Sequence, residues 1–165
     1  MFRFCLDMKL NMQKIFPFFL FLISTFLVSC DRNQVYEQNS QIGQGIWNVR
    51  KPVVFDFEIS RLNQRYNVYL NVRNSPEYPY SNLFLFLTTT YPDEKKSKDT
   101  LELTLADYDG RWLGSGMGSV KFSRFQLKKG LQFMKTGRYR FEMEQAMRVN
   151  DLKGIRDIGL RIEKQ

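Results

Sequence analysis

Residues 137–147 read GRYRFEMEQAM, and this stretch decides the fold class. Its apolar residues Tyr139, Phe141 and Met143 alternate with charged residues, so in an extended chain they all face one side. A helix would scatter the same residues around its axis, because its period is 3.6 residues rather than two. The pattern therefore predicts a β-strand with one buried face and one face in water.

The same alternation recurs along the rest of the chain. It is present in VVFDFEI (53–59), YNVYLNVR (66–73), TLELTLA (100–106) and IRDIGLRIEK (155–164). The run LFLFLTTT (83–90) begins apolar on both faces, which favours a central strand. In SVKFSRFQL (119–127) the apolar residues change phase between Phe122 and Phe125, which predicts a β-bulge there. Glycine, proline and charged loops separate these runs.

About eight short strands, with no convincing helical period between them, are typical of an all-β chain. We predict a single antiparallel β-sandwich over 47–165, in which each sheet buries one face and exposes the other. A jelly roll is the first choice, because eight strands in two sheets is its usual count. An immunoglobulin-like sandwich is the second choice.

The N-terminal segment differs from the rest of the chain. Residues 15–28 form an apolar run of 14 residues without a charge, directly after Lys14. A basic start followed by a short apolar run is the layout of a secretory signal, and a membrane-spanning helix needs about 20 residues. We therefore expect 1–29 to be a signal peptide, with Met12 as the true start.

The signal ends in LVSC (27–30), which resembles the lipobox of bacterial lipoproteins. In that family a diacylglyceryl group is attached to the cysteine sulfur and the chain is cut just before it, so the resemblance implies lipidation of Cys30. Two or three acyl chains anchor a protein stably, whereas one binds only marginally. A plain secretory signal and an uncleaved anchor helix are the alternatives. The polar residues 30–46 are then expected to be a lipidated, flexible tether.

Composition excludes several kinds of chemistry. The chain has no histidine, so Ser-His-Asp and Cys-His catalysis and histidine metal sites are excluded. Removal of 1–29 leaves Cys30 as the only cysteine, which excludes a disulfide and a thiolate metal site. It also leaves 22 basic and 16 acidic residues. Such a mild basic excess favours contact with anionic head groups or acidic polymers, or is a solvated surface.

Two sets of residues are weak candidates for binding. Asp107 and Asp109 lie in the sequence DYDG, where clustered carboxylates could contribute to a calcium site. The sequence lacks the remaining ligands, and Asp-Gly is equally typical of a turn. Aromatic side chains in or near loops could stack on sugars or pack at the rim of the sheets, namely Trp47, Tyr78, Tyr80, Tyr91 and Trp112.

Other polar residues have a structural and a functional interpretation. Four beside strand ends are expected to tie loops to the sheets through hydrogen bonds, with partner contact as the alternative: Asn74, Asn82, Gln145 and Arg148. Glu142 and Glu144 could act as the acid–base pair of a glycoside hydrolase. Their position among arginines on one strand instead favours cross-strand charge pairing. We therefore expect no enzymatic activity and no cofactor.

Five long segments resemble the gliding-motility lipoprotein H (GldH) family. They are YNVYLNVRN (66–74), YPYSNLFLF (78–86), DTLELTLADYDGRWLGSGMG (99–118), FEMEQAMR (141–148) and LKGIRDIGLRIEK (152–164). The likeness covers the mature chain in order, and the lipobox is in the expected place. Only the residues before Met12 depart from the family pattern.

The resemblance implies a membrane-anchored lipoprotein of the cell envelope, periplasmic or associated with the outer membrane. In this family it would be a non-enzymatic structural or accessory component of the gliding machinery, linked to type IX secretion. The implied partners are the membrane and other envelope proteins of those systems, and no nucleic acid. A carbohydrate-binding envelope lipoprotein with a jelly-roll domain is the alternative.

Overall fold

The computed structural model describes residues 32–116 and 118–165, and the signal peptide and lipidation site expected within 1–30 lie outside them. The described elements are β1 (Gln34–Gln41), the 3-10 turn η2 (Gly43–Gly45), β2 (Ile46–Asn48), β3 (Val53–Ile59), β4 (Tyr66–Asn74), β5 (Asn82–Thr90), β6 (Lys96–Thr104), β7 (Lys121–Leu131), β8 (Gly137–Gln145), β9 (Asp151–Lys153) and β10 (Ile155–Lys164). No helix in this part of the chain has the length and apolar character needed to cross a bilayer.

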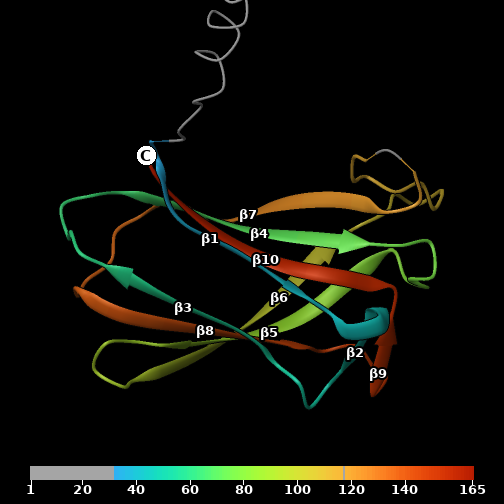
Figure 1. Ribbon diagram of the computed structural model, residues 1–165, viewed down its shortest axis with the longest axis horizontal. Coiled ribbons are helices and arrows are strands. Elements are labelled where there is room, and N and C mark those ends of the chain that lie inside the picture. Colours follow the sequence, from blue (N-terminus) through green and yellow to red (C-terminus); the bar gives the residue numbers. More distant parts are fainter. Residues whose placement is uncertain (1–31, 117) are drawn as a thin grey trace, which may run out of the picture. The chain divides into compact units, whose positions relative to one another are not determined.

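The strands form two four-stranded sheets and one short ribbon (Figure 1). Sheet I has the order β1-β10-β4-β7, sheet II has the order β3-β8-β5-β6, and β2 pairs with β9. The antiparallel pairs are nested along the chain, as in one long hairpin folded over into two layers. They are β1–β10, β3–β8, β4–β7 and β5–β6. This is the strand order of a jelly roll. The prediction of an all-β antiparallel sandwich is therefore confirmed, with the jelly roll as its topology.

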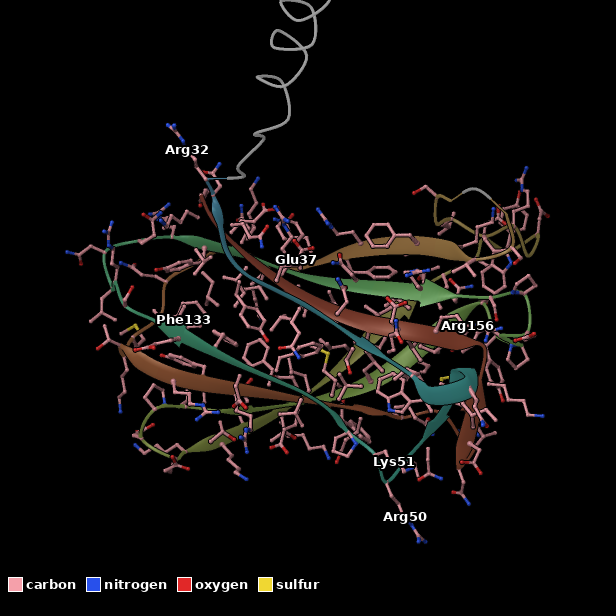
Figure 2. All side chains as sticks on the ribbon, viewed as in Figure 1. Arg32, Glu37, Arg50, Lys51, Phe133 and Arg156 are labelled. Carbon is pink, nitrogen blue, oxygen red and sulfur yellow. The ribbon has the colours of Figure 1, made fainter. Side chains whose placement is uncertain are left out.

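The alternating residues form the core between the two sheets. In β3 and β8, Phe55 pairs with Phe141 in the register, and both side chains are buried. Phe133, from the loop before β8, lies between the layers (Figure 2), with its ring centroid 4.8 Å from that of Tyr139 and 5.4 Å from that of Tyr66. Burying each such side chain contributes about 1.5–3 kcal/mol to stability. The core thus holds together a domain in which the described residues contain no disulfide.

Within the segment predicted to be a flexible tether, the described residues 32–46 are largely structured. Gln34–Gln41 forms β1, an edge strand that pairs with β10 along its whole length. Tyr36 faces inward, and its ring centroid lies 5.6 Å from that of Phe57. Main-chain hydrogen bonds to β10 hold this strand, and they do not depend on its polar side chains. The compact unit therefore begins at Asn33 rather than at residue 47.

Strand β7 departs from the prediction in one detail. Its register with β4 is regular from Phe122 to Phe125, where a bulge was expected. Phe122 therefore faces outward and Phe125 inward. Two register shifts lie instead further along the pair, between Tyr66 and Val68 and between Val68 and Tyr69 of β4. The central position predicted for 83–90 is correct, because β5 lies between β8 and β6.

Candidate functional site

The outer face of sheet I carries a hollow of about 280 Å³ that we call the polar groove. All four strands of the sheet contribute to it, since the outward residues of neighbouring strands stand side by side in the register. Its lining residues are Glu37, Asn39, Gln41, Asn71, Arg73, Phe122, Arg124 and Asp157.

Gly159 of β10 forms the floor of the polar groove. It is buried, and it lies between Asn39 of β1 and Asn71 of β4 in the register. A Cβ atom at this position would lie 1.9 Å from Asn39 Oδ1 and 3.3 Å from Asn71 Cβ. The missing side chain therefore lets the two asparagines approach each other across β10, and any larger residue would displace at least one of them.

Asn71 positions a cation on one side of the polar groove. Its side chain is only 2% exposed, and its Oδ1 accepts a hydrogen bond of 3.0 Å from Arg124 Nε. The Arg124 guanidinium carbon lies 5.8 Å from the ring centroid of Tyr69 and 5.7 Å from that of Phe122. A guanidinium held by an amide and two rings has a fixed orientation, so its remaining N–H groups are preorganised donors.

Asp157 places a buried carboxylate at the other side. The residue is 5% exposed, and Oδ2 lies 3.2 Å from Arg73 Nη1, whose side chain is half-exposed. Burial raises the pKa of Asp157 above its ordinary value, because the desolvation of the charged form outweighs the attraction of Arg73. Desolvation of this carboxylate in the face of the sheet costs free energy. Asp157 is therefore a candidate for contact with a hydrogen-bond donor of another molecule.

The polar groove thus gathers donors and acceptors that the domain itself uses only in part. Within residues 32–116 and 118–165, the side-chain amides of Asn39 and Gln41 make no hydrogen bond. Amides, a fixed guanidinium and a carboxylate that converge on one hollow can bind a polar partner with defined geometry. The alternation in 66–73 places Asn71 and Arg73 on the outward face of their strand. The signal that could have located the rest of the groove is Gly159, on a strand that pairs with Asn39 on one neighbour and Asn71 on the other.

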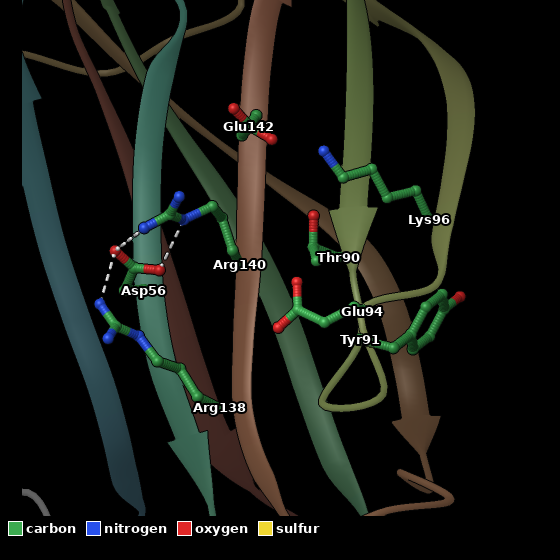
Figure 3. A pocket seen from close by; sticks show the side chains of 8 residues that line it. All are labelled: Asp56, Thr90, Tyr91, Glu94, Lys96, Arg138, Arg140 and Glu142. Atoms are coloured by element: carbon green, nitrogen blue, oxygen red, sulfur yellow. Dashed lines mark hydrogen bonds and ion pairs between the residues drawn. The ribbon is translucent and has the colours of Figure 1, made fainter.

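A second hollow, of about 290 Å³, lies on the outer face of sheet II (Figure 3). Asp56 of β3 stands between two arginines of β8, at 2.8 Å from Arg140 Nε and 3.1 Å from Arg138 Nη2. The hydrogen bond from Arg140 is the main cause that lowers the pKa of the Asp56 carboxyl. The two arginines are exposed and pair with the half-buried Asp56, and ion pairs at a surface contribute little to stability.

The two glutamates considered for catalysis belong to this charged face. Glu144 Oε2 lies 2.9 Å from Lys98 Nζ of β6, and Glu142 lines the hollow of Figure 3. Glu144 therefore has the cross-strand charge pairing expected from its place on the strand.

A third hollow, of about 360 Å³, is apolar and opens between the edge strands β6 and β7. Leu101, Leu127 and Leu131 line its sides, with Asp99 and Lys128 among the polar residues of its lining. Asp99 pairs with the buried Leu87 in the register, so it occupies an inward position on a free edge strand. Charged residues placed this way hinder pairing of the edge with other chains.

The DYDG sequence forms a turn, and its two carboxylates take part in it. Asp107 Oδ1 accepts hydrogen bonds from the main-chain N–H groups of Asp109 and Arg111, at 3.0 and 2.9 Å. The Arg111 guanidinium then pairs with both carboxylates, at 3.0 Å from Asp107 and 3.2 Å from Asp109. In the described residues, no three His, Cys, Asp or Glu side chains are grouped so as to hold a metal ion.

Most of the loop aromatics are packing residues. Trp47 is 1% exposed and Tyr78 is 2% exposed, and the half-buried Trp112 packs against the core. Tyr80 and Tyr91 remain partly exposed, at 36% and 37%, but they lie at opposite ends of the sandwich. These residues therefore do not form the exposed platform that stacking on a sugar requires.

The polar residues beside strand ends have different roles. Gln145 ties a loop to β8, since its Nε2 donates to Val149 O at 2.7 Å and its Oε1 accepts from Met147 N at 2.9 Å. Asn82 instead links two strands, with 2.9 Å from its Nδ2 to Glu102 Oε1. For Asn74 the expectation is wrong, because neither atom of its buried amide has a partner among the described residues. Arg148 is exposed.

Comparison with known proteins identifies the family. A model of the GldH lipoprotein family matches residues 34–162, from the start of β1 into β10. The chain belongs to the GldH lipoprotein family. It is 36% identical over 161 residues to a gliding motility lipoprotein GldH homolog of Christiangramia forsetii, covering 93% of this chain and 98% of the relative. It is 33% identical over 153 residues to the gliding motility lipoprotein GldH of Flavobacterium johnsoniae, covering 88% and 94%.

The resemblance to GldH seen in the sequence is thus confirmed, and the chain is a gliding-motility lipoprotein of the cell envelope. Among solved structures, the crystal structure of dimeric latent PorU from Porphyromonas gingivalis matches with a TM-score of 0.32 and 9% identity. That match covers 84% of this GldH-family chain and 14% of PorU, and its score is too low to support any argument about fold or function.

Proposed function

We propose that this protein is lipidated at Cys30 and acts as a non-enzymatic accessory subunit of the gliding machinery, linked to type IX secretion. In this proposal, the polar groove of sheet I docks a polypeptide segment of another envelope protein. The observation that carries it is the convergence of the Asn39 and Gln41 amides, the fixed Arg124 guanidinium and the buried Asp157 carboxylate on one hollow.

A polypeptide suits this site better than a sugar does. Strand β1, which contributes Asn39 and Gln41, is an edge strand of sheet I, so one side of its main chain is open to a further strand. A partner segment could pair with that edge while its polar side chains meet the polar groove. The loop aromatics that suggested sugar binding are mostly packed inside the domain.

The test is cross-linking and purification of the tagged lipoprotein from cells, with variants that alter the polar groove without harming the fold. Asn39→Lys with Gln41→Lys places bulk and charge in the groove, and neither amide contributes a hydrogen bond to the described domain. The matched control is Thr100→Lys with Thr104→Lys, on exposed positions of edge strand β6 in sheet II.

We expect the groove variant to lose a co-purifying envelope protein and surface spreading, and the control to keep both. Equal recovery of the same proteins with both variants would contradict docking through the polar groove. Lipidation is tested separately by the intact mass of the purified chain, which should begin at Cys30 and carry acyl groups. A chain that begins at Met12, or one without acyl groups, would contradict the anchor.

A further inference from the structure

Three loops and both ends of the compact unit meet at one end of the sandwich, at the left of Figure 1. We call this the anchor end; it comprises Asn33, loops 60–65, 91–95 and 132–136, and the C-terminal residues 164–165. Main-chain hydrogen bonds join its parts: Lys164 N donates to Asn33 O at 2.8 Å, and Gln165 N donates to Arg65 O at 3.0 Å. These hydrogen bonds connect the chain ends and the loop 60–65 of the anchor end to one another.

The anchor end carries more basic than acidic side chains, since loop 91–95 supplies only the carboxylates Asp93 and Glu94. Asp93 is already paired, at 2.6 Å from Lys135 Nζ and 3.5 Å from Lys95 Nζ, and Glu94 lines the hollow of sheet II beside Arg140. Four further cations lie at or beside this end and form no ion pair within the part of the chain that the structure describes: Arg61, Arg65, Lys129 and Lys164. A cluster of unpaired cations attracts an anionic surface.

Two apolar side chains project from the same end. Met134 is 84% exposed and Leu62 is 39% exposed, each at the tip of a loop. Gln132 Nε2 donates to Leu62 O at 3.3 Å, so the two loops lie against each other. Apolar tips flanked by cations are the arrangement that enters the interfacial region of a bilayer, where the side chains leave water and the cations meet head groups.

The lipid proposed on Cys30 would hold this end near the membrane. Cys30 precedes Asn33 by three residues, and each residue spans at most about 3.3–3.6 Å, so a lipid on Cys30 keeps Asn33 within about 10 Å of the anchored atom. A short tether of this kind makes a second contact with the same surface effectively intramolecular.

We propose that the anchor end docks on anionic lipid head groups, with Leu62 and Met134 in the interfacial layer. This rests on the proposed lipidation of Cys30 and adds a second, electrostatic contact that fixes the orientation of the domain. The strands of sheet I then run away from the bilayer, and the polar groove on its outer face is open to a partner that approaches along the membrane.

The test uses the acylated chain, purified from membranes and reconstituted in phosphatidylcholine vesicles with or without phosphatidylglycerol. Lipidation would block the thiol of Cys30, so a single new cysteine can be labelled with a fluorophore. We compare Leu62→Cys with Tyr108→Cys, a 96% exposed position in the connection between β6 and β7 at the opposite end. Nitroxide-bearing lipids then report how close each label lies to the bilayer.

The expected result is several-fold stronger quenching at position 62 than at 108, present with phosphatidylglycerol and reduced by Arg61→Glu with Arg65→Glu. Equal quenching at both positions, or quenching independent of anionic lipid, from a chain that carries acyl groups would overturn the docking and leave the anchor standing. A chain without acyl groups would overturn both. Circular dichroism of each variant checks that the fold is retained.

Discussion

Replacing Gly159 by alanine should disturb the polar groove and change the stability of the domain only slightly. The new Cβ would lie 1.9 Å from Asn39 Oδ1, so the Asn39 side chain must leave the groove. Asn39 is exposed on an edge strand and its amide makes no hydrogen bond in the described chain, so it can rotate at little cost. Asn71 Cβ, at 3.3 Å, has to yield by a few tenths of an ångström. We expect a loss of about 1 kcal/mol at most.

Urea denaturation measures that loss. With a slope of about 2 kcal/mol per molar, the midpoint of Gly159→Ala should fall by about half a molar or less. Co-purification of the envelope partner should nevertheless be lost, because the floor of the polar groove is filled. Gly43→Ala is the matched control, since its Cβ would meet no atom within 4 Å. A Gly159→Ala protein that keeps its partner, or one that unfolds outright, would contradict the role proposed for Gly159.

Gly154→Ala should cost about 3 kcal/mol or more, because its φ is +88° and a Cβ would lie 2.3 Å from Tyr78 N, which is main chain and cannot rotate away; an unchanged urea midpoint would contradict this. Leu160→Ala, at a fully buried position, should cost about 2–5 kcal/mol in the same assay. Asp157→Asn tests the sign of a pKa shift. Burial raises the pKa of Asp157 above 3.8 in the folded state. Proton binding by Asp157 therefore contributes fully to stability below pH 3.8, and this contribution is lost as the pH rises through the pKa of the folded state. The Asn variant should therefore gain on the wild type as the pH rises from about 3 to 7, despite losing the charge pair with Arg73, and a constant difference would contradict the shift.

The fold was largely predictable from the sequence because burial on one face imposes alternation on a strand. Val53, Phe55 and Phe57 of β3 are buried as their spacing predicts, as are the alternating residues of β4, β8 and β10. Strand β1 was not predictable in this way, since main-chain pairing with β10 stabilises it and its side chains are mostly polar. The bulge in β7 was misplaced because a change of apolar phase also arises when an aromatic residue such as Phe122 faces outward.

The candidate site was much less predictable, because it is assembled across strands. Asn39, Asn71 and Asp157 lie on three different strands, and only the register brings them together. Gly159 reads in the sequence as a weak strand residue, and its role is apparent only from the atoms around it. The aromatics Trp47, in the short strand β2, and Tyr78, in a loop, were weak candidates for the opposite reason, since the sequence does not reveal that these side chains turn into the core.

We propose above that a lipid-anchored jelly roll presents the polar groove to another envelope protein. The most direct measurement is photo-cross-linking in gliding cells, with a photoreactive amino acid at Gln41 in the groove or at Thr88 on the outer face of sheet II. We expect one discrete adduct with an envelope protein from position 41 and none from position 88, in cells that still glide. The same adducts from both positions, or no adduct from position 41, would contradict it.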